Sequence, residues 1–231
     1  MPRSSCAFKY NDQMVSAQDS PVSKARPRRA TRRQARELVA EFRRESILDA
    51  ARTVFARHGF AGTTMELIAR AADVAKGTLY LYYPSKSAIY SAAVVEGLRE
   101  LATETARVLE SGDAIRTMLR AFFLTRLRYF EERVDFFRIY SAEVGNLGRA
   151  ATQIRQEYAR LYDAQVDLLE RALRTAAKAG DIGTVDARTV ATAAFDLSHG
   201  LVVRHVRSVT EKRHPDLDAV LELLWKGIEA R

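Results

Sequence analysis

The sequence predicts an all-α protein of about nine helices, arranged as a small N-terminal unit and a larger C-terminal domain. From Ser85 onward, apolar residues recur at helical spacing, and breaks occur only near 111–112, 145–148, 180–183 and 214–215. These breaks define about six segments. Upstream, 63–86 contains two short helical patterns separated by a tight turn, and 47–58 contains one more. The boundaries that we expect are a basic extension at 1–39, a three-helix helix-turn-helix unit at 40–86 and a helical domain at 87–231.

The extension at 1–39 is polar and carries three of the chain's five prolines, so we expect it to be mostly disordered. Residues 24–44 hold nine Lys or Arg against two Glu, which is +7 of the formal net charge of +8. Such a segment can contact phosphates without any fixed structure. The alternatives are a solvated charged tail and a translation start at Met14. Residues 28–36 either continue as a helix into the next element or stay extended.

The first helix of the helix-turn-helix unit is predicted to end at Gly59. Glycine suits the left-handed conformation in which many helices end. The apolar face of this helix consists of Ile47, Ala51, Val54, Phe55 and His58.

The second helix is expected to begin at Thr63 or Thr64. Thr63 stands three residues before Glu66, which is the spacing of a capping box. Asp73 ends the helical pattern, and its short polar side chain tolerates the left-handed conformation that the turn requires. The apolar stripe of this helix is Met65, Ile68, Ala69 and Ala72.

The third helix is predicted to begin at Lys76 and to be ended by Pro84. Leu79 and Tyr83 share one face, which we expect to be packed. The opposite face gathers side chains that donate hydrogen bonds to phosphates and base edges, and Gly77 allows close backbone approach. A hairpin made only for packing is the alternative, but it gives no reason for this polarity. The polar side chains are Lys76, Thr78, Tyr80 and Tyr82.

The segment GTLYLYYPSK at 77–86 resembles the DNA-binding domain of TetR-type repressors, and the resemblance extends upstream through ILDAARTVFARHGF at 47–60. One departure is Asp73, where that family usually has glycine. The resemblance makes repression the default activity, with activation still open. Lys86 is expected to contact a phosphate. The full set of residues expected at DNA is Thr64, Lys76, Gly77, Thr78, Tyr80, Leu81, Tyr82, Lys86, Arg43, Arg32 and Arg33.

The domain at 87–231 is expected to bind an effector and to dimerise. Its last two helices are predicted at 186–209 and 216–228, and no long polar sequence remains to cover the apolar stripe of the second. In TetR-like proteins the corresponding helices form a four-helix bundle with their symmetry mates, which implies a homodimer. Packing within one subunit is the alternative. Gly200 would let two helices approach closely there. The residues expected at the interface are Leu197, Leu201, Leu217, Leu221, Leu224 and Ile228.

An effector pocket is expected among the middle helices. Glu143 would favour a cationic or hydroxyl-bearing compound, unless it pairs with an arginine such as Arg126 or Arg155. A place in the ordinary core is the alternative for His199 and for the aromatic stretch before Glu143. The candidate lining is Phe123, Tyr140, Glu143, Tyr158, Tyr162 and His199.

No catalytic or metal-binding pattern stands out in the sequence. The four histidines are not spaced as paired ligands, and there is no Ser-His-Asp motif, CxxC pair or phosphate-binding glycine loop. Cys6 is the single cysteine and forms no intramolecular disulfide. We therefore expect no enzymatic activity, no cofactor and no metal. No apolar run approaches the roughly 18 residues of a membrane span and no export signal is recognised, so we expect a cytoplasmic protein.

The predicted function is that of a transcriptional regulator. A homodimer would hold two recognition helices about 34–36 Å apart and bind a palindromic operator on double-stranded DNA. A small-molecule effector that prefers another spacing would release the DNA. The alternative is a nucleoid-like basic helical protein that binds nucleic acid without reading its sequence.

Overall fold

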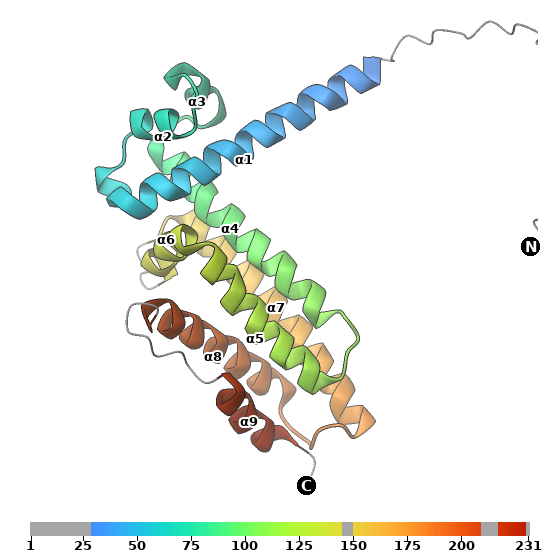
Figure 1. Ribbon diagram of the computed structural model, residues 1–231. Coiled ribbons are helices and arrows are strands. Elements are labelled where there is room, and N and C mark those ends of the chain that lie inside the picture. Colours follow the sequence, from blue (N-terminus) through green and yellow to red (C-terminus); the bar gives the residue numbers. More distant parts are fainter. Residues whose placement is uncertain (1–28, 145–149, 209–216, 230–231) are drawn as a thin grey trace, which may run out of the picture. The chain divides into compact units, whose positions relative to one another are not determined.

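The computed structural model describes residues 29–144, 150–208 and 217–229, and every regular element in these ranges is a helix (Figure 1). The chain divides into two units, 1–40 and 41–231, which are described separately. Within the described ranges, no helix is both long enough and apolar enough to cross a membrane.

The described part of the first unit, residues 29–40, is the beginning of helix α1 (Arg29–Gly62). Its sequence lacks glycine and proline and is rich in alanine and arginine, which are strong helix formers. Arg33 donates a hydrogen bond to Glu37 one turn later, at 2.8 Å. The expectation of disorder was therefore wrong for 29–39, where the helical alternative holds. For 1–28 that expectation lies outside the described residues.

The helix-turn-helix unit consists of the second part of α1, α2 (Met65–Ala71) and α3 (Lys76–Tyr82). Gly59 leaves the helical conformation, with φ 66° and ψ 175°, so the predicted break is confirmed. The predicted apolar face of α1 is buried except for His58, which is exposed because it lies in the last turn before the break. Its buried members are Ile47, Ala51, Val54 and Phe55.

Six further helices follow within the described residues, the number expected, although the junction at Arg133 was not among the predicted breaks. The breaks at 110–114 and 180–186 fall where serine and glycine predicted them, and Gly180 ends α7 in the left-handed conformation, with φ 81°. The helices are α4 (Lys86–Leu109), α5 (Ile115–Glu132), α6 (Val134–Val144), α7 (Thr152–Ala179), α8 (Ala187–Ser208) and α9 (Leu217–Ile228).

The main packing in the larger domain joins α4 to α5 and α7, and α8 to α5 and α7 (Figure 1). Two apolar clusters fill it. One includes Phe130, Phe136 and Tyr140 and continues into the helix-turn-helix unit through Ile89, whereas the other contains Phe122 and extends to α9. The core of the helix-turn-helix unit is thus continuous with the core around α6.

Candidate nucleic-acid interface and sensing cavity

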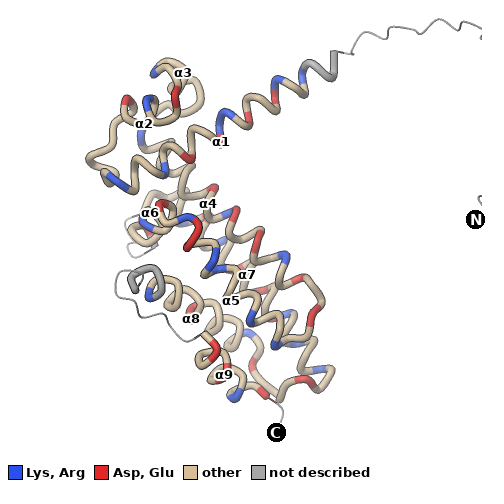
Figure 2. Tube along the Cα trace, in the orientation of Figure 1, with Lys and Arg blue, Asp and Glu red and all other residues tan. Residues whose placement is uncertain are grey.

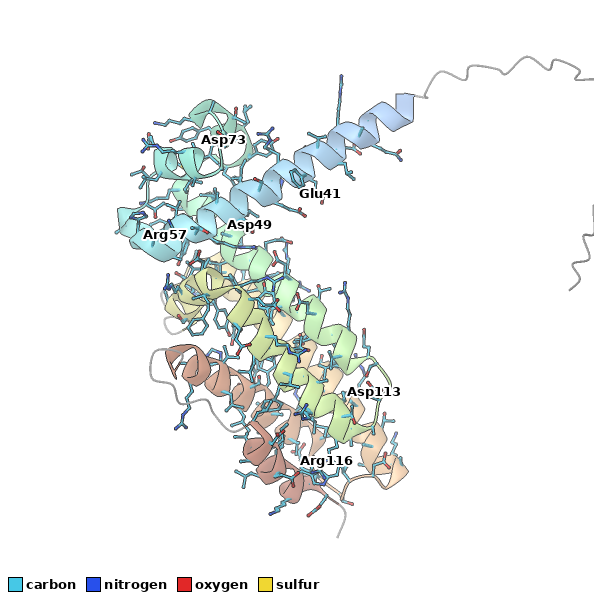
Figure 3. The ribbon with its side chains drawn as sticks, viewed as in Figure 1. Glu41, Asp49, Arg57, Asp73, Asp113 and Arg116 are labelled. Atoms are coloured by element: carbon cyan, nitrogen blue, oxygen red, sulfur yellow. The ribbon has the colours of Figure 1, made fainter. Side chains whose placement is uncertain are left out.

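The turn between α2 and α3 depends on Asp73, which Figure 3 labels between the two helices. Its φ is +50°, the left-handed conformation, and no other described non-glycine residue has a positive φ. The backbone N–H of Val74 donates to the carbonyl of Ala69 at 3.0 Å and closes the turn. The prediction that aspartate replaces the usual glycine without loss of the turn is confirmed.

The helix α2 is capped by Thr64, whose hydroxyl oxygen accepts the Leu67 backbone N–H at 3.2 Å. The capping box assigned to Thr63 was wrong. The hydroxyl of Thr63 is buried and donates instead to the carbonyl of Gly59 at 2.7 Å, so it holds the end of α1.

The helix α3 has the two faces that its sequence predicts. Leu79 and the following Tyr83 are buried, whereas Tyr80 and Leu81 are exposed, Leu81 by 85%. Tyr82 is only partly available, because it packs against the core and lies under the Arg44 guanidinium, 6.0 Å from the ring centroid. The exposed face also includes Lys76 and Gly77, with Thr78 half-buried beside them.

An ion pair between α2 and α3 balances the charge on this surface. The Lys76 ammonium donates a hydrogen bond to the Glu66 carboxylate. That hydrogen bond lowers the pKa of Glu66 and raises the pKa of Lys76. Both side chains are exposed, so a phosphate can compete for Lys76.

Lys86 occupies a different position from the one expected of a phosphate ligand. Its ammonium donates to the carbonyls of Phe60 at 2.7 Å and Thr63 at 2.9 Å, and lies 4.5 Å from the centroid of the Phe60 ring. These carbonyls belong to the end of α1 and the segment after it. Lys86 therefore ties α4 to α1 in the free protein, and its predicted phosphate contact stays a prediction.

The remaining predicted DNA contacts are basic residues of α1, along which basic and acidic positions alternate (Figure 2). Arg43 is exposed. Arg33 is exposed and paired with Glu37. The side chain of Arg32 lies outside the described residues. Their contact with DNA stays a prediction.

A small cavity of about 30 Å³ lies among α4, α5, α6, α7 and α8. It has room for one or two water molecules. Three of the six predicted pocket residues line it, namely Tyr140, Tyr158 and Tyr162. Leu98, Leu101, Leu161 and Phe195 form most of its apolar wall, and the polar remainder includes Arg126 and Gln165.

The sequence did not predict that Arg126 lines this cavity. Arg126 is only 3% exposed, and its guanidinium lies 4.4 Å from the Phe195 ring centroid and 5.7 Å from that of Phe122. Its Nε is the one buried side-chain nitrogen or oxygen of the described chain without a hydrogen-bond partner. A signal was present, because Arg126 follows Phe122 by one helical turn inside an apolar stripe.

The other predicted pocket residues lie outside the cavity lining. Glu143 accepts a hydrogen bond from the Tyr90 hydroxyl at 2.7 Å, so its partner is a tyrosine of α4 and not an arginine. Phe123 is buried in the core, edge-on to Phe122. His199 Nδ1 lies 2.9 Å from the Tyr140 hydroxyl, one residue behind the wall, and burial lowers the pKa of His199.

A larger depression of about 450 Å³ lies at the turn between α4 and α5, beside the end of α7. Its charged residues, such as Arg171 and Asp181, are exposed and therefore already solvated. Among the described residues, no group of three His, Cys, Asp or Glu is placed to hold a metal ion. The cavity around Arg126 is the better candidate for a specific ligand, because a buried polar atom there lacks a partner.

The predicted dimer residues divide into two groups. Leu201 and Ile228 are buried within the single chain and are not available to a partner, whereas Leu197 is exposed. Leu221 and Leu224 are half-buried and line a groove of about 210 Å³ against α5. The guanidinium of Arg116, a residue that Figure 3 labels, lies 5.0 Å from the centroid of the Trp225 ring. Leu217 is also half-buried.

The exposed apolar surface of α9 is instead Leu223, which is 75% exposed and was not predicted at the interface. On α8 the exposed face contains Ala193, Leu197 and Gly200, spaced at one-turn intervals. A side chain at Gly200 would meet nothing of the same chain within 4 Å.

Comparison with known proteins agrees with this architecture. Residues 47–93 match the family model for bacterial regulatory proteins of the tetR family. The HTH-type transcriptional regulator YhgD of Bacillus subtilis is 25% identical over 196 residues, which are 81% of this chain and 97% of YhgD. The HTH-type transcriptional repressor KstR2 of Rhodococcus jostii is 31% identical over 105 residues, which are 46% of this chain and 52% of KstR2.

A solved structure shows the same fold. The TetR family transcription regulator from Marinobacter aquaeolei superposes with a TM-score of 0.64 at 23% sequence identity, and the match covers 84% of this chain and 100% of that one. The helix-turn-helix with its exposed α3, the family model over 47–93 and the relatives together identify the chain as a DNA-binding transcriptional regulator whose helix-turn-helix domain is similar to that of the tetR family.

Proposed function

We propose that the protein is a homodimer that binds a palindromic operator through α3 and releases it when an effector occupies the cavity around Arg126. The observation that carries DNA reading is the exposed face of α3. Tyr80 offers a hydroxyl to base edges or phosphates, and Leu81 offers an apolar contact of the kind that recognises thymine methyl groups. Lys76 exchanges Glu66 for a phosphate when DNA binds.

Dimerisation through α8 and α9 is supported by their exposed apolar residues. Leu223 is 75% exposed and Leu197 is 38% exposed in the single chain, and Gly200 leaves space for a second helix backbone. If these helices pair with the same helices of a second subunit, two-fold symmetry relates the α3 helices of the two subunits. Two half-sites bound at once gain affinity through effective concentration.

Repression is the activity that we propose for the bound state. The name of KstR2 describes it as a repressor, and its similarity to this chain supports the same role here. An effector releases the operator only if it prefers the conformation that binds DNA less well. The cavity can supply this preference for one conformation. Its volume is small, so side chains have to move before a ligand enters.

The first experiment compares binding to DNA directly upstream of the protein's own coding region with binding to random DNA at matched salt. Specific regulators gain about 10³–10⁷ in affinity over nonspecific sites. Thr78→Val and Tyr80→Phe should each lower operator affinity about tenfold and leave helicity intact. Thr175→Val, at an exposed hydroxyl of α7, is the control. Equal affinity for both DNAs would reject sequence reading.

The second experiment measures the oligomeric state by light scattering. Leu223→Glu and Leu197→Glu should each give a monomer with weaker operator binding, because a carboxylate in an apolar interface is costly to desolvate. Val134→Glu is the matched control, since Val134 is also an exposed apolar residue but lies on α6. A stable dimer in both interface variants would place the interface elsewhere.

A further inference from the structure

The cavity among α4, α5, α6, α7 and α8 contains a positive charge that no described carboxylate neutralises. Arg126 is 3% exposed and its Nε has no acceptor. Within the described ranges no ion pair joins its guanidinium to a carboxylate. Burial lowers the pKa of Arg126, and the nearby Tyr140 and Tyr158 act against that shift. Arginine remains protonated in proteins, so this site keeps its charge.

The other polar groups of the cavity already have partners. Gln165 accepts a hydrogen bond from Thr105 and donates one to the carbonyl of Ala102 at 3.0 Å. The Tyr162 hydroxyl donates to Asp196 at 3.2 Å. The unmet requirement of the cavity is therefore an acceptor for Arg126, surrounded by apolar wall.

We propose that the effector is an anion on an apolar body, a carboxylate or a chemically similar oxyanion, whose oxygens bind the Arg126 guanidinium. The proposal rests on the proposed function, in which this cavity binds the effector. This effector is anionic, whereas Glu143 suggested a cationic or hydroxyl-bearing compound. Glu143 does not determine the charge of the effector, because it accepts a hydrogen bond from Tyr90 and does not line the cavity. A carboxylate accepts the parallel N–H groups of a guanidinium, which gives both strength and orientation.

The apolar body has to displace part of the wall, because the cavity of about 30 Å³ does not hold it in the present conformation. Tyr158 and Tyr162 are half-buried aromatic members of the lining on α7, and their ring centroids lie 6.3 Å apart. The Tyr162 ring lies edge-on to Phe195 of α8 at 4.7 Å. Entry of a ligand between α7 and α8 therefore moves residues that join these two helices.

A purely structural role for Arg126 is distinguishable from a ligand-binding role. If the guanidinium supports the core through the Phe195 and Phe122 rings, Arg126→Met lowers the melting temperature. If the charge is retained for a ligand, the same variant melts at an equal or higher temperature, because replacing a buried unpaired charge by an apolar side chain removes a desolvation penalty.

The experiment uses three probes with one alkyl chain and different head groups: decanoate, decanamide and decyltrimethylammonium, all below micelle-forming concentrations. Hexanoate, tetradecanoate and 4-phenylbutyrate vary the apolar body. Binding is measured by calorimetry, and release of operator DNA is measured by fluorescence anisotropy. We expect at least one carboxylate to bind and to release DNA at least tenfold more effectively than its neutral or cationic counterpart.

The variants Arg126→Met and Arg120→Met separate the roles, because Arg120 lies on the same helix but is exposed and paired with Asp218. Arg126→Met should bind the operator normally and lose at least tenfold in carboxylate affinity, whereas Arg120→Met should respond as the wild type does. A preference for the amide or the ammonium probe, no carboxylate binding, or an unchanged response in Arg126→Met would overturn the anionic assignment. Release by a neutral or cationic probe would leave the proposed function standing, whereas loss of specific operator binding by the wild type would count against that function itself.

Discussion

At the scale of single residues, Lys86 illustrates how one side chain can serve the fold beside a DNA-binding surface. Its ammonium donates hydrogen bonds to the carbonyls of Phe60 and Thr63, which both follow the break at Gly59. A hydrogen bond from a charged donor to a neutral acceptor contributes about 1.5–3 kcal/mol in favourable cases. The contact is therefore a main link between α4 and the end of α1.

We expect Lys86→Met to lower the free energy of unfolding by about 1–3 kcal/mol. In a chain of this size that corresponds to a fall in melting temperature of about 2–4 °C for each kcal/mol. Lys76→Met should change the melting temperature little, because Lys76 is exposed and its ion pair with Glu66 is open to solvent. Calorimetry measures the melting temperatures of both variants. Equal values for Lys86→Met and Lys76→Met would mean that the hydrogen bonds of Lys86 do not stabilise the contact between α4 and α1.

The residues that sequence reasoning placed well are those whose role is set by local geometry. Asp73 and Gly59 were assigned from backbone preference alone, and the structure shows both with positive φ. The partners of Glu143 and Arg126 were harder to predict. A carboxylate or guanidinium near an aromatic stretch can pair with residues that are distant in the sequence, and only the packing of the helices decides which of them come close. Tyr90 is 53 positions from Glu143 in the chain, and no local pattern links them.

At the scale of helices, the breaks that contain glycine or proline were predictable and the break between α5 and α6 was not. The junction is Arg133, with φ −124° and ψ 57°, and neither glycine nor proline marks it. The Arg133 guanidinium lies 4.3 Å from the Tyr129 ring centroid and within 4 Å of Glu100 and Glu104 on α4. This bend depends on contacts with another helix, which periodicity within one segment does not report.

A second pair of helices, α4 and α7, is joined by a carboxylate that should make stability depend on pH. Glu157 of α7 accepts hydrogen bonds from Arg99 of α4 at 2.8 Å and from Arg160 of its own helix at 2.7 Å. The hydrogen bonds with Arg160 and then Arg99 lower the pKa of Glu157 to about 2. Because the pKa is lower in the folded state, this group stabilises the fold fully above its ordinary pKa of about 4.5.

We expect the stabilisation by Glu157 to be lost as the pH falls from about 4.5 to about 2. Glu157→Gln should be less stable than the wild type at pH 7, and the difference should shrink over this acid range. Thermal unfolding followed by circular dichroism at several pH values measures it. Glu110→Gln, at an exposed position after α4, is the control. A difference between wild type and Glu157→Gln that stays constant with pH would contradict the prediction.

At the scale of the whole molecule, α6 connects the cavity to the DNA-binding half. Tyr140 of α6 lines the cavity, and Phe136 one turn earlier lies 5.7 Å from the guanidinium of Arg52 on α1. Arg52 in turn donates to Glu100 of α4 at 2.9 Å. Gly97 of α4 permits this arrangement, since a Cβ there would fall 2.2 Å from the Phe136 ring. A ligand that displaces Tyr140 therefore acts on a helix already packed against α1 and α4.

The hydroxyl of Tyr90 offers a small change with which to test this connection. The Tyr90 ring lies edge-on to Phe55 of α1 at 4.8 Å, and its hydroxyl donates to Glu143 of α6. Tyr90→Phe keeps the ring and removes only the bond to α6. Substitutions along a coupling network change coupling by about 0.5–2 kcal/mol, which is roughly 2- to 30-fold in effector concentration.

We expect Tyr90→Phe to bind the operator with near-normal affinity but to need a several-fold different effector concentration for half-maximal release. Anisotropy titrations with the active carboxylate measure both quantities in one experiment. Thr103→Val is the control, because the Thr103 hydroxyl is exposed and donates to the carbonyl of Arg99 on its own helix α4 at 2.9 Å. If the release curves of wild type and Tyr90→Phe coincide while the carboxylate still binds at Arg126, the signal does not pass through α6, and the contact between Tyr90 and Glu143 serves packing alone.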